Sequence, residues 1–337
     1  MATRPKPDAP TLDQTIQVTT RHDRSIFMFF IQMLLRPFHR HVGRPGKRQP
    51  KGSIELKPSP IGTKRCTVKH RKVCDLNVYD MESKELSTEE GKKRIYYFCG
   101  GGWQSPPSMQ HWGMCSRMAQ DVPGTTVSLV SYPLAPNNPA PEAFPWLMRF
   151  YREIMDRAEE VGEKVILAGD SSGGNIVLSL ILEALQADDE EAMQSEIKCR
   201  PHPVAVFATC PSTDLTRNNP DIKKLEKKDP MLRFKFVKST AEAWRGDWDP
   251  ADRRVTPINA NISLLAKYGI HVHGITAGHD ILSPDGIIFR KKLEENGVSG
   301  QWLHWEKQMH CFVLTYPYGL REAKEAIDWV MDVLKAE

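Results

Sequence analysis

The 337 residues hold 46 Lys and Arg against 42 Asp and Glu, and the small net charge of +4 argues against nucleic acid as the main partner. The length suffices for one large α/β domain, or two small ones, with a buried core. The seven scattered cysteines include no C-x-x-C pair and no His/Cys cluster at zinc spacing. They argue against a disulfide framework or a structural metal site, and favour reduced thiols in the cytoplasm.

Residues 1–60 are predicted to form an N-terminal arm that contains one helix. Residues 1–24 are polar and predict an irregular segment. Residues 26–35 are apolar on nearly every side, with Ser25 as a candidate N-cap and Pro37 as a stop. This helix is too short to span a bilayer, and it begins too far into the chain for a secretory signal.

The pattern allows three interpretations of the helix at residues 26–35. It is buried against the domain, it covers an apolar pocket as a cap, or it makes a weak contact with a membrane surface. The last would be helped by residues 36–57, which hold seven Lys or Arg and a single acid, Glu55. The Gly- and Pro-rich residues 43–60 predict a linker whose charges are solvated.

A glycine run follows the third predicted strand. Residues 64–68 and 73–79 predict two strands, and residues 94–98 predict a third, strongly apolar one. This third strand leads into the sequence Cys-Gly-Gly-Gly-Trp at residues 99–103. Glycines directly after a strand let backbone N–H groups point at a ligand, because no Cβ stands in the way. The alternative is a flexible turn.

The rest of the chain alternates predicted helices and strands. In order, these are a helix at 109–120, a strand at 126–131, a helix at 146–161, a strand at 165–168, a helix at 176–185, strands at 204–208 and 270–276, a helix at 287–296, a strand at 301–305 and a helix at 322–336. Such alternation predicts an α/β fold with a mostly parallel central sheet and helices on both faces. Residues 215–249 interrupt the alternation of strands and helices, and they predict an insertion between the core segments 61–214 and 250–337.

The sequence EKVILAGDSSGGN at residues 163–175 predicts a strand, a tight turn and a helix. Gly169 and Gly173 flank Ser171 in the pattern G-x-S-x-G, whose small residues let the strand and the helix pass closely. Such a turn exposes the serine hydroxyl and points N–H groups of the helix start at developing negative charge. The pentapeptide alone also fits a simple helix cap, so its meaning depends on what lies beside it.

Two further reactive side chains, Asp280 and His310, come shortly after predicted strands. Functional residues gather at the carboxyl ends of parallel strands, so Ser171, Asp280 and His310 are expected to meet. Serine, acid and histidine in this chain order are typical of nucleophilic catalysis on an α/β sheet. Asp285 is the alternative acid.

These motifs resemble those of the hormone-sensitive-lipase-like branch of the α/β-hydrolases. Members of that branch carry H-G-G-G-W/F, Y-R-L-A-P, G-D-S-A-G-G, D-x-L-x-D and H-x-F in this order. The corresponding segments here begin at Cys99, Tyr132, Gly169, Asp280 and His310. The resemblance runs from about residue 94 to the C-terminus. Residues 244–286 and 305–312 are similar to fungal members, some of which serve natural-product pathways.

The resemblance implies an α/β-hydrolase fold with a helical cap, and a serine carboxylesterase that hydrolyses small to medium apolar esters. In this mechanism Ser171 attacks the ester carbonyl and His310 takes its proton. Asp280 holds His310 in the required tautomer and stabilises the imidazolium.

The same resemblance implies an oxyanion hole made of the backbone N–H groups of Gly100, Gly101 and Ser172. The chain departs from the family at Cys99, which stands in place of a histidine. Because Cys99 follows an apolar strand, the sequence predicts a buried, inert thiol there. The backbone donors do not depend on that side chain.

The family also places its N-terminal segment and an insertion over the active site, which assigns the helix at 26–35 and residues 215–249 to a cap. Substrate contacts are then expected from Trp103 and from the helix residues Phe29, Phe30 and Met33. Their side chains are large and apolar, and methionine adapts to varied shapes.

Two other classes of function share these residues. The same triad serves acyl-transferring, lactonising or cyclising enzymes, and some relatives keep the fold as a non-catalytic receptor after losing the histidine. The presence of His310 favours an enzyme. We expect a small-molecule ester as the partner, no nucleic acid, no metal and no cofactor, and we leave a homodimer open.

Overall fold

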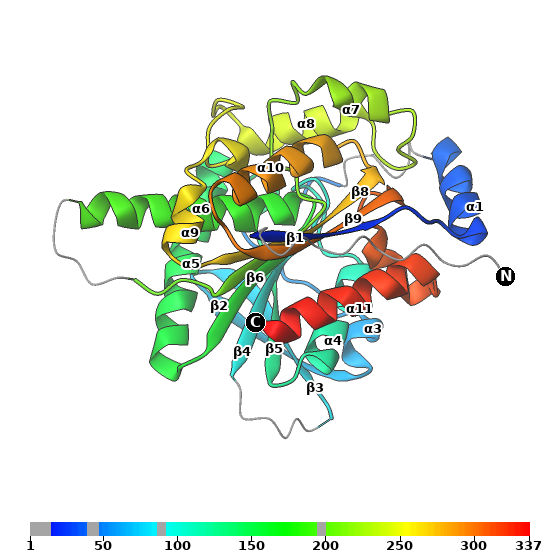
Figure 1. The fold of residues 1–337 in the computed structure, drawn as a ribbon. Helices are drawn as coiled ribbons and strands as arrows, with labels where there is room; N and C mark the ends of the chain where they lie inside the picture. Colours follow the sequence, from blue (N-terminus) through cyan, green and yellow to red (C-terminus); the bar gives the residue numbers. More distant parts are fainter. Residues whose placement is uncertain (1–14, 39–46, 86–91, 194–199) are drawn as a thin grey trace.

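The computed structural model describes residues 15–38, 47–85, 92–193 and 200–337 (Figure 1). Residues 1–14 of the predicted arm lie outside the described residues, as do residues 39–46, which include the start of the linker predicted at 43–60. Nine strands form one sheet in the order β1-β9-β8-β7-β6-β4-β5-β3-β2. The pairing is parallel from β1 through β5 and antiparallel at β5–β3 and β3–β2, so the predicted mostly parallel sheet is confirmed.

Each strand and helix predicted after residue 60 overlaps an element of the structure. The strands are β1 (Ile16–Arg21), β2 (Cys66–Val73), β3 (Leu76–Ser83), β4 (Lys93–Phe98), β5 (Thr125–Ser131), β6 (Lys164–Asp170), β7 (Ala205–Thr209), β8 (His271–His279) and β9 (Gly300–Met309). The α-helices are α1 (Ile26–Leu35), α3 (Pro60–Thr63), α4 (Met109–Asp121), α5 (Ala140–Val161), α6 (Ser172–Ala192), α7 (Pro220–Leu225), α8 (Phe234–Arg245), α9 (Ser263–Lys267), α10 (Ser283–Glu295) and α11 (Arg321–Ala336). The 3-10 helices are η1 (Arg36–Phe38), η2 (Pro257–Asn259) and η3 (Phe312–Tyr318).

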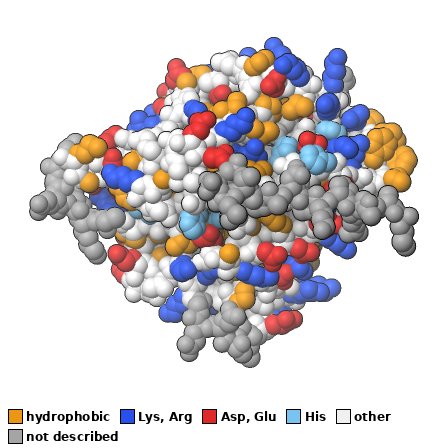
Figure 2. All heavy atoms as spheres, viewed as in Figure 1, with side chains coloured by type: hydrophobic (Ala, Val, Ile, Leu, Met, Phe, Trp, Pro, Cys, Tyr) orange, Lys and Arg blue, Asp and Glu red, His pale blue; other side chains and the backbone are white. Residues whose placement is uncertain are grey.

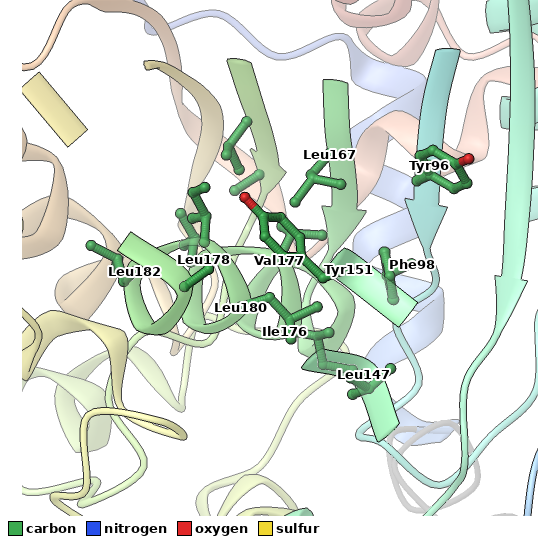
Figure 3. Close-up of a cluster of buried hydrophobic side chains, with 14 of the residues drawn as sticks. Tyr96, Phe98, Leu147, Tyr151, Leu167, Ile176, Val177, Leu178, Leu180 and Leu182 are labelled. Carbon is green, nitrogen blue, oxygen red and sulfur yellow. The ribbon is translucent and has the colours of Figure 1, made fainter. Parts of the chain in front are cut away.

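Helices cover both faces of the sheet. One core joins the sheet to α5, α6, α9 and α10, and a second joins it to α3, α4 and α11. In β6, Val165 and Leu167 belong to the first core, whereas Ile166 and Ala168 belong to the second. Figure 3 shows Leu167 above the apolar side chains of α5 and α6. The strand before Ser171 is continuously apolar because both of its faces are buried.

The structure corrects the predicted irregular arm at residues 1–24, because residues 16–21 form β1. This strand pairs in parallel with β9, at the edge of the sheet. Ile16 is fully buried in the first core, and Val18 packs against it. The polar residues around Ile16 and Val18 hide the apolar–polar alternation that would predict a strand. The pairing partner, β9, lies near the other end of the chain.

Helix α1 touches the domain through only a narrow side, so the interpretation of a helix buried against the domain is wrong. Met28 and Gln32 are its buried residues. Gln32 Nε2 donates to the carbonyl of Lys307, 2.9 Å away. Figure 2 shows hydrophobic side chains gathered at the end of the molecule where α1 lies. The exposed apolar side chains of α1 and η1 are Ile26, Phe27, Phe29, Phe30, Met33, Leu34 and Phe38.

Candidate active site

Ser171 occupies the tight turn between β6 and α6. Its backbone has φ 52° and ψ −114°, a conformation that is strained for a residue with a side chain. A Cβ on Gly169 would lie 2.6 Å from the backbone of Gly173, and one on Gly173 would overlap the carbonyl of Phe98. The two glycines therefore let β4, β6 and α6 approach closely enough to hold the turn.

The structure brings Ser171, Asp280 and His310 into one hydrogen-bond chain. His310 Nδ1 lies 2.8 Å from Asp280 Oδ2, and His310 Nε2 lies 2.9 Å from Ser171 Oγ. An ionised carboxylate only accepts hydrogen bonds, so Nδ1 donates to Asp280, and in the neutral imidazole the lone pair of Nε2 faces the serine hydroxyl. Such a chain can move a proton from a hydroxyl to an imidazole.

The electrostatics of His310 are governed by burial and by Asp280. Burial disfavours the charged imidazolium, but the Asp280 carboxylate outweighs it and raises the pKa of His310 to about 9. Asp280 itself is fully buried, and its second oxygen accepts the N–H of Leu282 at 2.9 Å. The acid is thus held in place by its own loop.

The alternative acid, Asp285, points elsewhere. It lies in the first turn of α10 and accepts a hydrogen bond of 2.7 Å from Asn219. Burial raises its pKa to about 6, even though Asn219 and the nearby Arg217 act in the opposite direction. Of the two predicted acids, Asp280 is the one that contacts His310.

Asp229 is a residue of this site that sequence analysis missed. Its carboxylate accepts the N–H groups of Met231 and Leu232, at 2.8 Å each, and that of Ile281 at 3.0 Å. Burial and the neighbouring Asp280 raise the pKa of Asp229 to about 6. Asp229 thereby ties residues 215–249 to the acid loop. The sequence carries no local signal for this contact, because about 50 residues separate the two partners.

The glycine loop after β4 is anchored by Asp170. Gly100 N–H donates to Asp170 Oδ1 at 3.0 Å, as does the hydroxyl of Tyr97 at 2.9 Å. His111 Nδ1 accepts the N–H of Ser108, so His111 Nε2 carries the proton and donates to Asp170 Oδ2 at 3.3 Å. Burial works against ionisation of Asp170, but these partners hold its pKa below the usual value.

This anchoring corrects the predicted set of oxyanion donors. The N–H group of Gly100 is already engaged, because it donates to Asp170 Oδ1. Ser172 follows Ser171 as the first residue of α6, and the role of Gly101 and Ser172 as donors stays a prediction. Cys99 is buried and burial raises its thiol pKa, in agreement with the prediction of an inert side chain.

The predicted substrate contacts occupy two different environments. Trp103 is 1% exposed, and its ring stacks on that of Trp244 from α8 with 5.9 Å between the centroids. It joins the glycine loop to residues 215–249. In contrast, Phe29, Phe30 and Met33 are 44–48% exposed on α1. The role of all four as substrate contacts stays a prediction.

Comparison with known proteins identifies the fold family. A family model described as alpha/beta hydrolase fold matches residues 95–314. The chain belongs to this family. Among curated α/β-hydrolase relatives, an esterase of Acinetobacter venetianus is 27% identical over 241 residues, which cover 69% of this chain and 71% of the esterase. Neutral cholesterol ester hydrolase 1 of Mus musculus is 24% identical over 307 residues, covering 71% and 73%.

Further similar proteins include hormone-sensitive lipases and an esterase from the bacterial hormone-sensitive lipase family. Human hormone-sensitive lipase is 27% identical over 155 residues, which cover 45% of this chain and 13% of the human protein. A solved esterase from the bacterial hormone-sensitive lipase family superposes with a TM-score of 0.73 at 19% identity, covering 93% of this chain and 99% of the esterase. The narrower likeness to fungal members stays a prediction.

The family and its esterase members make the chain a serine hydrolase that acts on ester bonds, as predicted. Among the described residues, no helix has both the length and the apolarity to cross a membrane. A cytoplasmic location, a homodimer and a place in a natural-product pathway stay predictions.

Proposed function

We propose that the chain is a serine carboxylesterase in which Ser171 is the nucleophile, His310 the general base and Asp280 the residue that orients it. The observation that carries this proposal is the unbroken chain of hydrogen bonds from Asp280 through His310 to Ser171, at 2.8 and 2.9 Å. The strained backbone of Ser171 adds support, because such strain is a feature of nucleophile turns.

In the proposed reaction, Ser171 Oγ attacks the ester carbonyl while its proton passes to His310 Nε2. The resulting imidazolium gives this proton to the departing alcohol, which leaves an acyl-enzyme. Water then attacks the acyl group and gives a proton to His310, which passes this proton to Ser171 Oγ as the acid is released. Asp280 remains ionised throughout and stabilises the imidazolium at each transfer.

The negative charge on the carbonyl oxygen needs backbone donors. We assign this role to the N–H groups of Gly101, from the glycine loop, and of Ser172, which directly follows the serine. The position of Ser172 as first residue of α6 adds the positive end of the helix dipole. Gly100 instead anchors the loop through Asp170.

The proposed cap consists of α1 and residues 215–249. Both lie beside the site: Gln32 Oε1 of α1 is 3.3 Å from Nδ1 of His279, the residue before Asp280. Arg36 donates to the carbonyl of Lys228, which links α1 to the insertion. The exposed rings of Phe29 and Phe30 favour small to medium apolar esters as substrates.

The test is Ser171→Ala, with Ser179→Ala as the matched control in the buried part of α6. The first variant should lose turnover of p-nitrophenyl esters and labelling by a fluorophosphonate probe, whereas the control should keep both. Circular dichroism checks that both variants fold. Full turnover by folded Ser171→Ala would rule out the assignment.

The products distinguish hydrolysis from acyl transfer. A free acid and an alcohol, identified by mass spectrometry, support a carboxylesterase. A lactone or a transesterified product formed from the same acyl-enzyme would instead support the transferase.

A further inference from the structure

Two thiols that the proposed reaction does not use lie against His310. Cys210 follows β7 and Cys311 follows His310, and both side chains are buried. The N–H of Cys311 donates to Cys210 Sγ at 3.4 Å, and Cys311 Sγ lies 3.4 Å from His310 Nε2. Nitrogen and both sulfurs all lie within 4.8 Å of one another. About 100 residues separate Cys210 from the other two, so their spacing in the sequence hides the cluster.

We propose that Cys210, Cys311 and His310 form a binding site for a thiophilic divalent metal such as Zn²⁺, and that metal bound there inhibits the enzyme. The inhibition, though not the binding, rests on the proposed role of His310. The metal would be an inhibitor, and the esterase reaction itself needs none.

The ligand set and its dimensions suit zinc. Two cysteines and one histidine are a known zinc set, with Zn–S near ~2.3 Å and Zn–N near ~2.0 Å. In a tetrahedron these lengths separate the ligand atoms by about 3.5–3.8 Å. The 3.4 Å between Cys311 Sγ and His310 Nε2 is already close to such an edge. The remaining sulfur has to move by no more than about 1 Å, since it starts within 4.8 Å.

Charge and orientation also favour binding at this site. Both thiols release their protons to solvent on coordination, and two thiolates neutralise the divalent ion, which lowers the cost of burying it. Asp280 accepts from His310 Nδ1 at 2.8 Å, and a metal-bound histidine commonly makes this contact with a carboxylate. The bond that orients His310 toward Ser171 would therefore orient it equally toward the metal.

Inhibition follows from the single lone pair on Nε2. Ser171 Oγ lies 2.9 Å from this nitrogen, and the serine loses its proton acceptor once the metal takes the lone pair. A bound metal would leave Ser171 in place but unactivated.

A second cluster, made of His271, His273 and Glu337, provides the contrast. There the N–H of Gln301 donates to His273 Nδ1, so His273 Nε2 carries a proton and donates to Glu337 at 2.9 Å. A metal on His273 Nε2 would need the proton on Nδ1, where the N–H of Gln301 stands, whereas His310 can release its Nε2 proton because Nδ1 keeps its own against Asp280. The Cys210 cluster is therefore the stronger metal site of the two.

The experiment titrates the full chain with Cd²⁺ and with Zn²⁺. Cd²⁺ reports thiolate binding through its ultraviolet charge-transfer absorbance, without any need for activity. Zn²⁺ inhibition is measured on a p-nitrophenyl ester, relative to the metal-free rate of each variant, and is reversed with EDTA. The variants are Cys210→Ser and Cys311→Ser, with alanine at the same positions as a second choice, and His271→Ala is the control for the other cluster.

We expect the wild type and His271→Ala to bind Cd²⁺ through thiolate and to lose turnover with Zn²⁺. Each cysteine variant should lose the absorbance and need at least ~10–100-fold more Zn²⁺ for the same inhibition. Undiminished absorbance in both cysteine variants, or thiolate binding without inhibition of the wild type, would overturn the proposal. The Ser171→Ala labelling test uses no metal and therefore judges the proposed function separately.

Discussion

At the scale of single residues, the choice of acid depends on which carboxylate reaches His310 Nδ1. Asp280 and Asp285 are five positions apart, and the sequence offers both. The loop after β8 turns Asp280 toward His310, whereas α10 begins at Ser283 and carries Asp285 toward Asn219. Burial is similar for the two, so position alone separates them.

Asp280→Asn should lower kcat by on the order of 10⁴, because the amide holds the histidine in the wrong tautomer. Asp285→Asn should lower kcat far less, since Asp285 contacts Asn219 and not His310. Steady-state kinetics on one p-nitrophenyl ester, with melting temperatures as a folding check, compare the two. A larger loss of kcat in Asp285→Asn than in Asp280→Asn would mean that Asp285 is the acid that orients His310.

The pH dependence of kcat/KM is an independent test of whether Asp280 or Asp285 acts on His310. Neutral His310 is the base, so turnover is present above the His310 pKa and is lost as the pH falls through it. Because Asp280 raises that pKa to about 9, the acidic limb of kcat/KM should lie above the ordinary imidazole value of about 6.5. The limb should move to lower pH in Asp280→Asn and stay in place in Asp285→Asn. An unmoved limb in Asp280→Asn would contradict the assignment.

At the level of helices, strands and loops, the site is held together by buried contacts between its loops. Asp170 holds the glycine loop, Asp229 holds the acid loop, and Trp103 stacks on Trp244 of α8. Each of these contacts is buried and joins segments that are distant in sequence. The geometry around Ser171 therefore depends on packing between elements as much as on the turn itself.

Gly100→Ala should lower kcat by about 10²–10³, because the loop that carries the proposed Gly101 donor must move. A Cβ at this position would clash with Asp170 and lie 3.0 Å from Ser171 Cβ. Gly286→Ala is the control, since its Cβ would meet only a methyl group of Thr276 at 3.2 Å. Equal activity of both variants would show that the loop position does not matter.

Helix α1 has two groups of exposed apolar residues, and substituting each group separately can distinguish its two remaining interpretations, a cap over the site and a membrane contact. A truncation would also remove β1, so substitutions are the sharper test. The triple variant with serine at Phe29, Phe30 and Met33 should raise KM for long-chain esters about tenfold or more, with little change for acetate esters, if these residues contact substrate. The control pair Phe27→Ser and Leu34→Ser should leave both KM values unchanged.

A membrane contact predicts another outcome for the same proteins. Both the triple variant and the control pair would then lose binding to anionic lipid vesicles, while KM for soluble bulky esters stays constant. Equal loss for short and long esters in the triple variant would remove the cap interpretation.

At the scale of the whole molecule, the N-terminal segment closes one edge of the fold against the C-terminal helix. β1 adds the last strand beside β9. Ser25 Oγ donates to Glu322 Oε2 at 3.1 Å, and Arg21 pairs with Glu325 at 2.8 Å, which joins the end of β1 and the N-cap of α1 to α11. The beginning and the end of the described chain thus stabilise each other.

Ile16→Ala should lower the free energy of unfolding by about 2–5 kcal/mol, the usual cost of deleting a fully buried aliphatic side chain. The exposed neighbour Gln17 provides the control, and Gln17→Ala should change stability by less than about 0.5 kcal/mol. Urea denaturation followed by circular dichroism measures both. Equal midpoints would mean that β1 contributes little to the fold.

The α/β architecture, the tight turn at Ser171 and the chain order of the reactive residues could be predicted from the sequence alone. These features have local causes: an apolar strand buried on both faces, glycines where a Cβ would clash, and side chains placed just after strands. In each case the residues that meet the physical requirement lie within a few positions of one another, so the pattern is visible in one sequence.

Four features became visible only in the folded chain: which acid meets His310, that Asp170 occupies the N–H of Gly100, that residues 16–21 form a strand, and that α1 exposes most of its apolar surface. Folding also places Cys210 and Cys311 against His310. Each of these depends on a contact between segments far apart in the chain, or on the direction in which a loop turns. Such contacts are set by the packing of the whole domain, and no local pattern of residues encodes them.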